Sequence, residues 1–503
     1  MNINKLQPEF LRLHPSDNVV VALAELPEGA SVEGVTVRQS IKRGHKVCTH
    51  PIKKGEIVRK YGQVIGIASA EIASGDWVHT HNLVMSDADR ATEIGADRRA
   101  LGASTATAAW SGYRRSDGRW GTRNTIAILT SVNCSATVAR RIAAAFPAEG
   151  LPEGVDDVAA YTHTGGCGGA SDGEDVRMLQ RTLAGYARHP NVAAVLIVGL
   201  GCEANQIPDW FVKEGLAPGP ALRSLSIQEA GGTLKAIEDG KAIVRELITL
   251  AAEARREPAP VSGLVVGLQC GGSDGWSGVT ANPALGRAVD RLIAQGGSAM
   301  LSETPEIWGA EHLLLRRADA ETAERLIARL TWWRDHASAN GMELNNNPSP
   351  GNLKGGLTTI LEKSLGAVAK AGSAPLEDVI GYAQPLRKPG LSFMDSPGYD
   401  PCSATGQIAS GANLIAFTTG RGSVFGSKPS PCLKIASNAR LAGWMAEDID
   451  IDASSVLEGE SLDDVGERIF HRLLSLASGD PSASEILGIG DAEFVPWQRG
   501  AYL

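Results

Sequence analysis

Short hydrophobic segments separated by turn residues occupy the first part of the chain. The hydrophobic and β-branched runs lie at residues 18–23, 35–37, 56–58, 64–68 and 77–81, with Pro, Gly and Lys between them. Several short strands interrupted in this way are typical of a small all-β module. We therefore expect a β domain over residues 1–88. It is followed at 89–111 by a polar segment rich in Ala, Ser and Thr, a composition that predicts a linker.

After residue 111 the pattern changes to an alternation of strands and helices. Continuous apolar runs at 125–130, 193–199 and 263–268 are typical of strands buried on both faces of a parallel sheet. The segments between them carry apolar residues at helical spacing, as at Val138, Ile142 and Phe146. This alternation predicts two α/β domains with mainly parallel sheets, at 112–258 and 259–503.

Composition and charge exclude several classes of function. The chain has 503 residues and a formal charge of −9, whereas a nucleic-acid-binding surface is expected to be basic. The first residues form no apolar signal core, and the most apolar segment, 192–201, is too short to cross a membrane. These features predict a cytoplasmic protein without nucleic-acid or membrane partners. The base rate for such proteins favours a homo-oligomer, with a dimer as the first expectation.

Four of the seven cysteines share one local context. Cys134, Cys167, Cys202 and Cys270 each follow a predicted strand closely. The carboxyl ends of strands form the ligand-binding edge of an open α/β sheet, so these four thiols could converge on one point. Thiolates there would bind iron or an iron–sulfur cluster. The competing interpretation is that each cysteine is a small buried hydrophobic residue, which is the common state of a free thiol.

Two histidines in the β domain form a second candidate metal site. His79 and His81 lie two residues apart on a predicted strand, so both imidazoles would face the same side. His45 and Lys46 lie in a turn of the same domain. A structural or surface role is the alternative for each histidine, because most buried polar side chains satisfy local hydrogen bonds.

Two glycine-rich loops after predicted strands are suited to binding anions. Residues 269–278 contain Ser273 and Asp274, and residues 418–426 contain Arg421, whose guanidinium matches a carboxylate. Neither loop matches the dinucleotide fingerprint or the phosphate loop, so a nicotinamide-dependent oxidoreductase is a weak alternative. A plain turn rich in glycine is the other interpretation.

Several longer segments, taken together, carry a family resemblance. They are RGHK (43–46), GYRRSDGRWGTRN (112–124), TSVNC (130–134), GLGCE (199–203), CGGSDG (270–275), GVTANP (278–283), NPSPGN (347–352) and TTGRG (418–422). In this order they resemble the altronate/galactarate dehydratase family of sugar-acid hydro-lyases, over nearly the whole chain. The segment VHTHN (78–82) is more similar to the altronate branch.

The resemblance implies a fold and a reaction. The fold is an N-terminal SAF (β-clip) domain followed by the two α/β domains. The reaction is loss of water from a hydroxylated sugar acid, giving a 2-keto-3-deoxy acid. The cofactor implied is Fe²⁺, with Mn²⁺ as a substitute and no organic cofactor. An iron–sulfur cluster stays open on the pattern of the cysteines alone. A bound cation would stabilise the charge that develops when the C2 proton leaves.

The same resemblance leads to a set of residue roles. The metal is assigned to Cys134, Cys167, Cys202 and Cys270, in whole or in part, or alternatively to His79 and His81. The remaining roles are His45 as acid/base, with Lys46 second; Arg123 and Arg421 for substrate carboxylates; and Ser273 and Asp274 for hydroxyls.

Two other functions stay open at this stage. One is a lyase of the same scaffold that expels sulfite from a sulfonated hydroxy acid. The other is a non-catalytic sugar-acid binding protein.

Overall fold

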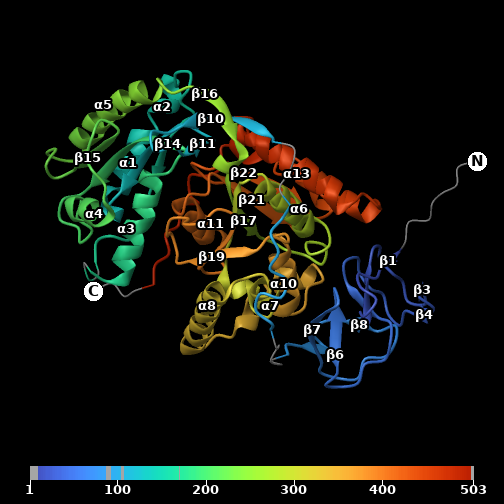
Figure 1. Ribbon diagram of the computed structural model, residues 1–503. Helices are drawn as coiled ribbons and strands as arrows, with labels where there is room; N and C mark the ends of the chain where they lie inside the picture. Colours follow the sequence, from blue (N-terminus) through green and yellow to red (C-terminus); the bar gives the residue numbers. More distant parts are fainter. Residues whose placement is uncertain (1–8, 87–91, 103–106, 169, 171, 500–503) are drawn as a thin grey trace, which may run out of the picture.

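The computed structural model describes residues 9–86, 92–102, 107–168, 170 and 172–499. In Figure 1 the chain forms a central C-terminal body, with the blue β domain on one side and the teal and green second domain on the other. Part of the segment predicted as a linker, at 89–91 and 103–106, lies outside the described residues. The predicted fold class is confirmed: a small β domain followed by α/β domains with parallel sheets.

The β domain consists of short antiparallel strands. Its two sheets have the orders β1-β2-β5-β8 and β6-β7-β9, with β3-β4 as a separate hairpin. The strands are β1 (Phe10–Leu11), β2 (Val19–Ala22), β3 (Ser31–Val32), β4 (Val35–Thr36), β5 (Lys46–Cys48), β6 (Ile57–Lys60), β7 (Gln63–Ala68), β8 (Trp77–Val78) and β9 (Leu83–Val84). β2 and β5 lie in the middle of the larger sheet and are buried along their whole length.

A three-stranded antiparallel sheet joins the two α/β domains. β10 (Ala109–Arg114) lies between β11 (Trp120–Gly121) and β16 (Arg256–Pro260). The first residues of β10 belong to the predicted linker segment, but there they pair with a strand far away in the sequence. The Trp110 indole also donates a hydrogen bond of 2.8 Å to the Pro260 carbonyl.

The second domain has a parallel four-stranded sheet of order β13-β12-β14-β15. Its elements are β12 (Thr125–Thr130), α1 (Ala136–Ala143), α2 (Phe146–Glu149), β13 (Asp157–Tyr161), α3 (Glu174–Ala187), β14 (Val192–Gly199), α4 (Ile207–Glu214), β15 (Leu222–Ser226) and α5 (Thr233–Ala251). The helix expected to run through Phe146 ends at Ala143, and Phe146 begins α2. Pro147 explains the break, because it has no N–H to continue the hydrogen bonding of α1.

The C-terminal domain is built on a parallel seven-stranded sheet of order β19-β20-β18-β17-β21-β22-β23. The strands are β17 (Val265–Cys270), β18 (Ser298–Leu301), β19 (Leu376–Ile380), β20 (Leu391–Met394), β21 (Leu414–Thr419), β22 (Cys432–Ala436) and β23 (Ile451–Asp452). The helices are α6 (Ala281–Ala294), α7 (Glu311–Leu315), α8 (Ala320–Ala339), α9 (Pro350–Lys354), α10 (Ile360–Ala369), α11 (Asp400–Ala409), α12 (Ala439–Trp444), α13 (Leu462–Ala477) and α14 (Ala483–Ile486).

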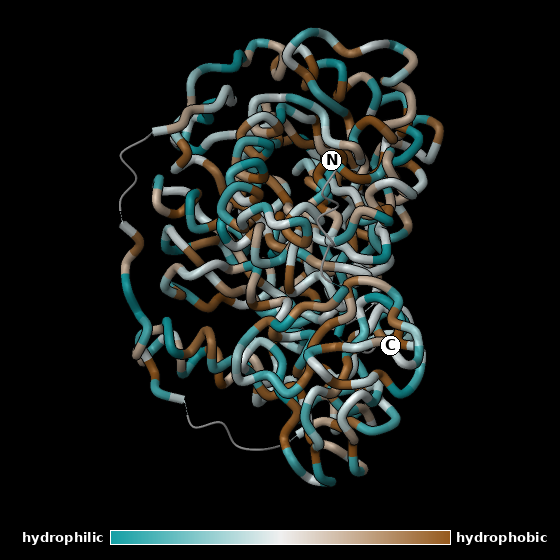
Figure 2. The backbone as a smooth tube through the Cα atoms, turned by 90° about the vertical axis from the view of Figure 1, so that its right-hand side faces the viewer, coloured by the Kyte–Doolittle hydropathy of each residue, from teal (hydrophilic) through white to brown (hydrophobic). Residues whose placement is uncertain are grey.

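Hydrophobic segments of the backbone are short and interrupted by hydrophilic ones (Figure 2). Within the described ranges, no helix combines the length and the apolar character needed to span a membrane. The largest hydrophobic cluster includes residues of β17, β21, α6 and α13, together with β-domain residues such as Val58 and Ile65. The β domain therefore shares a core with the C-terminal domain.

Candidate active site

A cavity of about 630 Å³ lies where the β domain meets the C-terminal domain. The β domain supplies the turn that precedes β5, and the C-terminal domain supplies the loops after β17 and β21, two neighbouring strands, together with α12. Its lining residues are Glu25, Lys42, Arg43, His45, Asp274, Trp276, Lys354, Gly355, Gly420, Arg421, Asn438, Arg440, Leu441 and Trp444. The cavity thus lies at the carboxyl edge of a parallel sheet, where ligands of α/β proteins commonly bind.

Five unpaired cations give the cavity a positive character. Lys42, Arg43, Lys354, Arg421 and Arg440 line it, against the carboxylates of Glu25 and Asp274. Over the described ranges, none of these five side chains forms an ion pair; Arg43 instead lies over the Trp276 ring. Unpaired guanidinium and ammonium groups around one cavity favour an anionic ligand.

Asp274 organises the cavity wall. Its Oδ1 accepts hydrogen bonds of 2.9 Å from the Ser277 and Ser437 hydroxyls, and its Oδ2 accepts one of 3.0 Å from Asn438. Burial raises the pKa of this carboxyl, while the hydrogen bonds act in the opposite direction. A Cβ at Gly420 would overlap the Asp274 carboxylate, so glycine is required beside Arg421. Asp274 therefore joins the loop after β17 to the loops after β21 and β22.

His45 lies in the cavity wall as a neutral imidazole. Trp77 donates to its Nδ1 at 3.1 Å, and its Nε2 lies 3.4 Å from the Lys354 carbonyl oxygen. Burial lowers the pKa of His45 to about 4, with further contributions from Lys46, His79 and Lys42. Because Trp77 can only donate, Nδ1 carries no proton and Nε2 does. In this state His45 is a hydrogen-bond donor through Nε2, and action as a base requires the Trp77 hydrogen bond to break.

A buried ion triad holds the β domain against the C-terminal domain. Glu362 on α10 accepts from Lys46 on β5 and from Lys60 on β6, each at 2.9 Å. Burial lowers the pKa of Lys46 to about 8, with Glu362 opposing this effect and Lys60 adding to it. Lys46 is wholly buried and does not line the cavity, so the structure gives it a docking position.

Glycines allow the turn at residue 44 to approach the C-terminal domain closely. Gly44 has a φ of +84°, and a Cβ at Gly275 or Gly356 would overlap the Gly44 carbonyl. The same contact region places His45 and Lys42 in the cavity.

The structure does not place His79 and His81 side by side on a strand. β8 ends at Val78, so the two histidines lie in a turn and the same-face argument is wrong. His79 is buried, with its Nε2 3.0 Å from the Leu353 carbonyl oxygen, whereas His81 is exposed. The His79 imidazole therefore helps dock the β domain on α9.

The four cysteines do not converge on one point. Cys270 is the last residue of β17 in the seven-stranded sheet, whereas Cys134, Cys167 and Cys202 follow strands of the four-stranded sheet. Cys270 is buried and the other three are exposed. The local context that they share in the sequence recurs in both α/β domains, which is why it could not show that they belong to different sheets.

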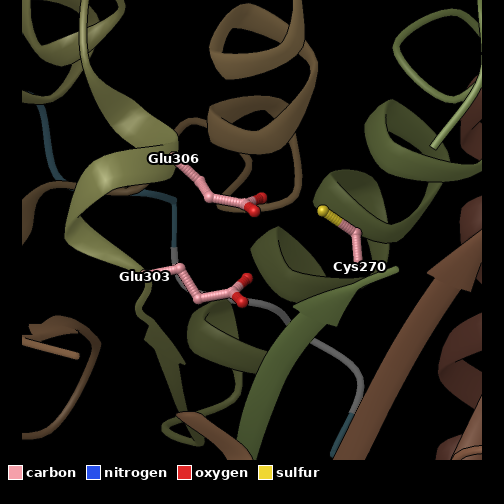
Figure 3. Close-up of side chains that lie close together, drawn as sticks. All are labelled: Cys270, Glu303 and Glu306. Carbon is pink, nitrogen blue, oxygen red and sulfur yellow. The ribbon is translucent and has the colours of Figure 1, made fainter. Parts of the chain in front are cut away.

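Cys270 instead meets two glutamates in the C-terminal domain. One ligand atom each from Cys270, Glu303 and Glu306 lies within 4.8 Å of the others (Figure 3). Both carboxylate oxygens of Glu303 and Oε2 of Glu306 are buried without a hydrogen-bond partner. Glu303 also has a φ of +69°, a left-handed conformation that is strained for a residue other than glycine. Unsatisfied buried oxygens and local strain at one place are typical of a functional site.

Negative charge accumulates in this cluster. Asp400 lies near it, while Lys363 donates to Glu306 at 2.8 Å and Lys370 approaches Cys270. Burial raises the pKa of Glu303 well above its usual value, with Glu306 and Asp400 adding to the effect, and burial raises that of Asp400 to about 7. Three carboxyls and a thiol face two ammonium groups, so a divalent cation fits both the donor set and the charge.

Glu303 and Glu306 were not predicted from the sequence. They follow β18, at the same carboxyl edge as Cys270, and that position was the available signal. The carboxyl ends of neighbouring parallel strands form one ligand-binding edge. This rule would have placed the two glutamates beside the loop that follows β17.

Two predicted substrate ligands lie elsewhere. Arg123 is buried and bound to Glu485 at 2.8 Å and to the carbonyls of Leu476 and Asp480, so its role in binding a substrate carboxylate is not supported. Ser273 does not line the cavity; its carbonyl accepts a 2.8 Å hydrogen bond from Asn352. Asp274 and Arg421, by contrast, lie together in the cavity wall, with His45.

Comparisons with known proteins agree over most of the chain. Three family models match it: "Altronate/galactarate dehydratase SAF domain" at residues 8–86, "D-galactarate dehydratase/Altronate hydrolase, second domain" at 112–252 and "D-galactarate/Altronate dehydratase, C-terminal" at 261–502.

Individual relatives are similar over most of their length. Altronate dehydratase of Escherichia coli (strain K12) is 38% identical over 95% of this chain and 97% of its own. Galactarate dehydratase (L-threo-forming) of the same organism is 35% identical over 93% of each. The (2R)-sulfolactate sulfo-lyase subunit beta of Chromohalobacter salexigens is 35% identical over 75% of this chain and 94% of its own. With its SAF domain, its two α/β domains and these relatives, the chain belongs to the altronate/galactarate dehydratase family of hydro-lyases.

Proposed function

We propose that this protein dehydrates an altronate-like or galactarate-like sugar acid to a 2-keto-3-deoxy acid. The observation that supports this most directly is the set of five unpaired cations around a cavity formed by two domains. The names of the relatives supply the substrate class: one acts on altronate and another on galactarate.

Arg421 and its neighbours bind the carboxylate end of the substrate in this proposal. The Arg421 guanidinium can form two parallel hydrogen bonds to a carboxylate. Trp444 stands at the cavity with 86% of its surface exposed, and its ring offers an apolar face to the C–H groups of a polyol.

The chemical difficulty lies in removing the C2 proton beside a carboxylate that is already negative. His45 is the only imidazole among the cavity-lining residues and is our candidate for this proton transfer. An anionic substrate beside His45 offsets the effect of Lys42 and Lys46 and so raises the imidazole pKa. Loss of the 3-hydroxyl then gives an enol, which becomes the 2-keto acid.

Cys270, Glu303 and Glu306 would hold the divalent cation that the family implies. When bound there, Fe²⁺ or Mn²⁺ supplies Lewis-acid stabilisation of developing negative charge. Cys270 and Asp274 are connected by the short loop 271–273, so the cluster and the cavity share one edge of the sheet.

An assay of keto-acid formation tests the proposed function. The full chain, prepared without oxygen, is incubated with altronate, galactarate and other aldonic and aldaric acids, with added Mn²⁺ and with chelator. We expect 2-keto acid from at least one polyhydroxy acid and loss of the activity with chelator. Saturable binding without turnover on the whole panel would contradict the proposal, and sulfite released from sulfolactate would favour the sulfo-lyase alternative.

The variant Arg421→Gln is expected to raise KM for the sugar acid by roughly 10- to 100-fold, because a charge-assisted hydrogen bond is worth about 1.5–3 kcal/mol. The matched control is Arg334→Gln on α8, whose guanidinium is exposed and pairs only with the adjacent Asp335 among the described residues. Steady-state kinetics on both variants provide the measurement. An unchanged KM in Arg421→Gln would remove the assignment of this residue to the carboxylate.

A further inference from the structure

Three exposed cysteines gather at one edge of the second domain. Cys134, Cys167 and Cys202 follow β12, β13 and β14, and β12 lies between the other two strands in the parallel sheet. All three thiols are free and exposed. Since parallel strands end at the same edge, the three cysteine loops are neighbours in space.

Hydrogen bonds hold these three loops against one another. The Asn133 N–H donates to the Gly165 carbonyl at 3.0 Å, and the Asn133 side chain donates to the His163 carbonyl at 3.0 Å. On the other side, the Asn205 N–H donates to the Gly166 carbonyl at 3.2 Å and its side chain to the Ser131 carbonyl at 2.9 Å. Each cysteine therefore lies within a few residues of a hydrogen bond that joins its loop to a neighbouring cysteine loop.

Buried polar side chains shape each loop from beneath. The His163 Nε2 donates to the Thr130 carbonyl at 2.8 Å and fixes the start of the Cys167 loop. Glu203 is buried and accepts from the Gly201 N–H at 2.6 Å and from the Ser131 hydroxyl, which shapes the turn at Cys202. A Cβ at Gly166 would overlap the Ser131 carbonyl, so only glycine lets the Cys167 loop approach β12 so closely. Such support beneath exposed thiols is expected of a site that must hold its ligands in place.

A donor already points at one of the sulfurs. The Gln228 side-chain N–H lies 3.5 Å from the Cys202 Sγ. Hydrogen bonds to cysteine sulfurs are one of the means by which a protein tunes an iron–sulfur cluster.

The sulfurs of Cys134, Cys167 and Cys202 are not close enough together to share a single ion. Among the described residues, only the Cys270 group brings three metal-ligand atoms within 4.8 Å of one another. A tetrahedral Zn²⁺ with Zn–S bonds of about 2.3 Å would require sulfurs roughly 3.8 Å apart. An iron–sulfur core is larger and holds its cysteines farther apart.

We propose that Cys134, Cys167 and Cys202 bind an iron–sulfur cluster at the carboxyl edge of the second domain. Each thiol gives up its proton as its sulfur binds iron, and the iron and sulfide of the core come from solution. Three thiolates are one fewer than the four that usually hold a 4Fe–4S core, so one iron is left for an oxygen ligand from solution. This site is separate from the cluster of Cys270, Glu303 and Glu306, which lies in the other sheet.

Anaerobic reconstitution of the full chain tests the proposal. The protein is supplied with equal amounts of ferrous and ferric iron and with as much sulfide as total iron, so that the core forms without another oxidant or reductant. We expect acid-labile sulfide together with a small excess of iron, the excess being the ion held by Cys270, Glu303 and Glu306. We also expect broad visible absorption and protection of all three thiols from alkylation. We expect each of the variants Cys134→Ser, Cys167→Ser and Cys202→Ser to bind at least about tenfold less sulfide than the wild type.

Two controls separate this result from other causes. Cys48→Ser should keep the cluster, because its Sγ donates only to the His50 carbonyl, as a serine hydroxyl can. Glu303→Gln should also keep the sulfide-containing cluster, because Glu303 lies in the other domain. Wild-type protein that binds iron without sulfide, or any of the three exposed variants that keeps the wild-type amount of sulfide, would overturn the proposal. None of these readouts depends on the sugar-acid reaction, so they remain decisive if the proposed function fails.

Discussion

Glu362→Gln is expected to lower the free energy of unfolding by about 3–5 kcal/mol, because it leaves two buried ammonium groups without their carboxylate. Lys46 and Lys60 are both buried, and Glu362 is the only carboxylate with which they pair over the described ranges. The amide keeps the shape of the side chain, so the effect is one of charge. Urea denaturation at neutral pH, followed by tryptophan fluorescence, measures it.

The matched control is Glu377→Gln, which breaks a pair with Arg98 whose side chains are 29% and 31% exposed. Partly exposed pairs contribute about 0–1 kcal/mol, so little change is expected. A loss below 1 kcal/mol in Glu362→Gln would show that the triad contributes little to the docking of the β domain.

The stability of Glu362→Gln should also rise with pH. Lys46 already has its pKa lowered from 10.5 to about 8 in the wild type, mainly by burial, and loss of the carboxylate lowers it further. Between that value and 10.5 the unfolded chain binds more protons than the folded chain, so stability increases with pH over this window. Repeating the urea titration at pH 7 and pH 9 should therefore show a smaller deficit at pH 9.

Glu303→Gln is expected to weaken Mn²⁺ binding by at least about 100-fold while leaving the metal-free protein as stable as the wild type, or more stable. Both carboxylate oxygens of Glu303 lack a hydrogen-bond partner, and Glu306 and Asp400 add negative charge beside it. Removing that charge therefore relieves repulsion in the metal-free protein and takes away a ligand from the metal-bound one. Mn²⁺ titration and thermal unfolding with chelator measure the two effects.

The two readouts distinguish a metal ligand from a structural residue. If Glu303 served only the fold, the variant would be destabilised and its Mn²⁺ affinity would not change. Glu324→Gln, at an exposed position of α8, is the matched control and should alter neither quantity. We also expect kcat to fall by at least about 100-fold in Glu303→Gln if the cation stabilises the developing charge.

The elements of the fold could be predicted well because their signals are local. The apolar run at 193–199 is β14, the run at 125–130 is β12, and the run at 263–268 lies in β17. Two elements differ from the prediction, one because of a nearby proline and the other because of a distant partner strand. Pro147 breaks the helix expected through Phe146, and β10 forms in the predicted linker because its partner strand, β16, comes more than 140 residues later.

The candidate site was predicted in part. Asp274, Arg421 and His45 do line one cavity, and Cys270 does belong to a group of side chains that could bind a metal ion. His79 and His81 do not share a strand face because β8 ends at Val78. Arg123 forms an ion pair with Glu485 and is not in the cavity. Glu303 and Glu306 were missed because nothing near them in the sequence marks them as partners of a thiol.

The sequence by itself determined the family, the order of strands and helices, and the placement of the thiols and the cationic loops at strand ends. Side-chain periodicity and turn chemistry act over a few residues, so they can be read without knowing what packs against what. Only the tertiary structure decided which strand ends share an edge. It separated Cys270 from the other three cysteines, brought two glutamates to it, and closed the cavity with a turn of the β domain. Those outcomes depend on the packing of segments hundreds of residues apart, which no local pattern encodes.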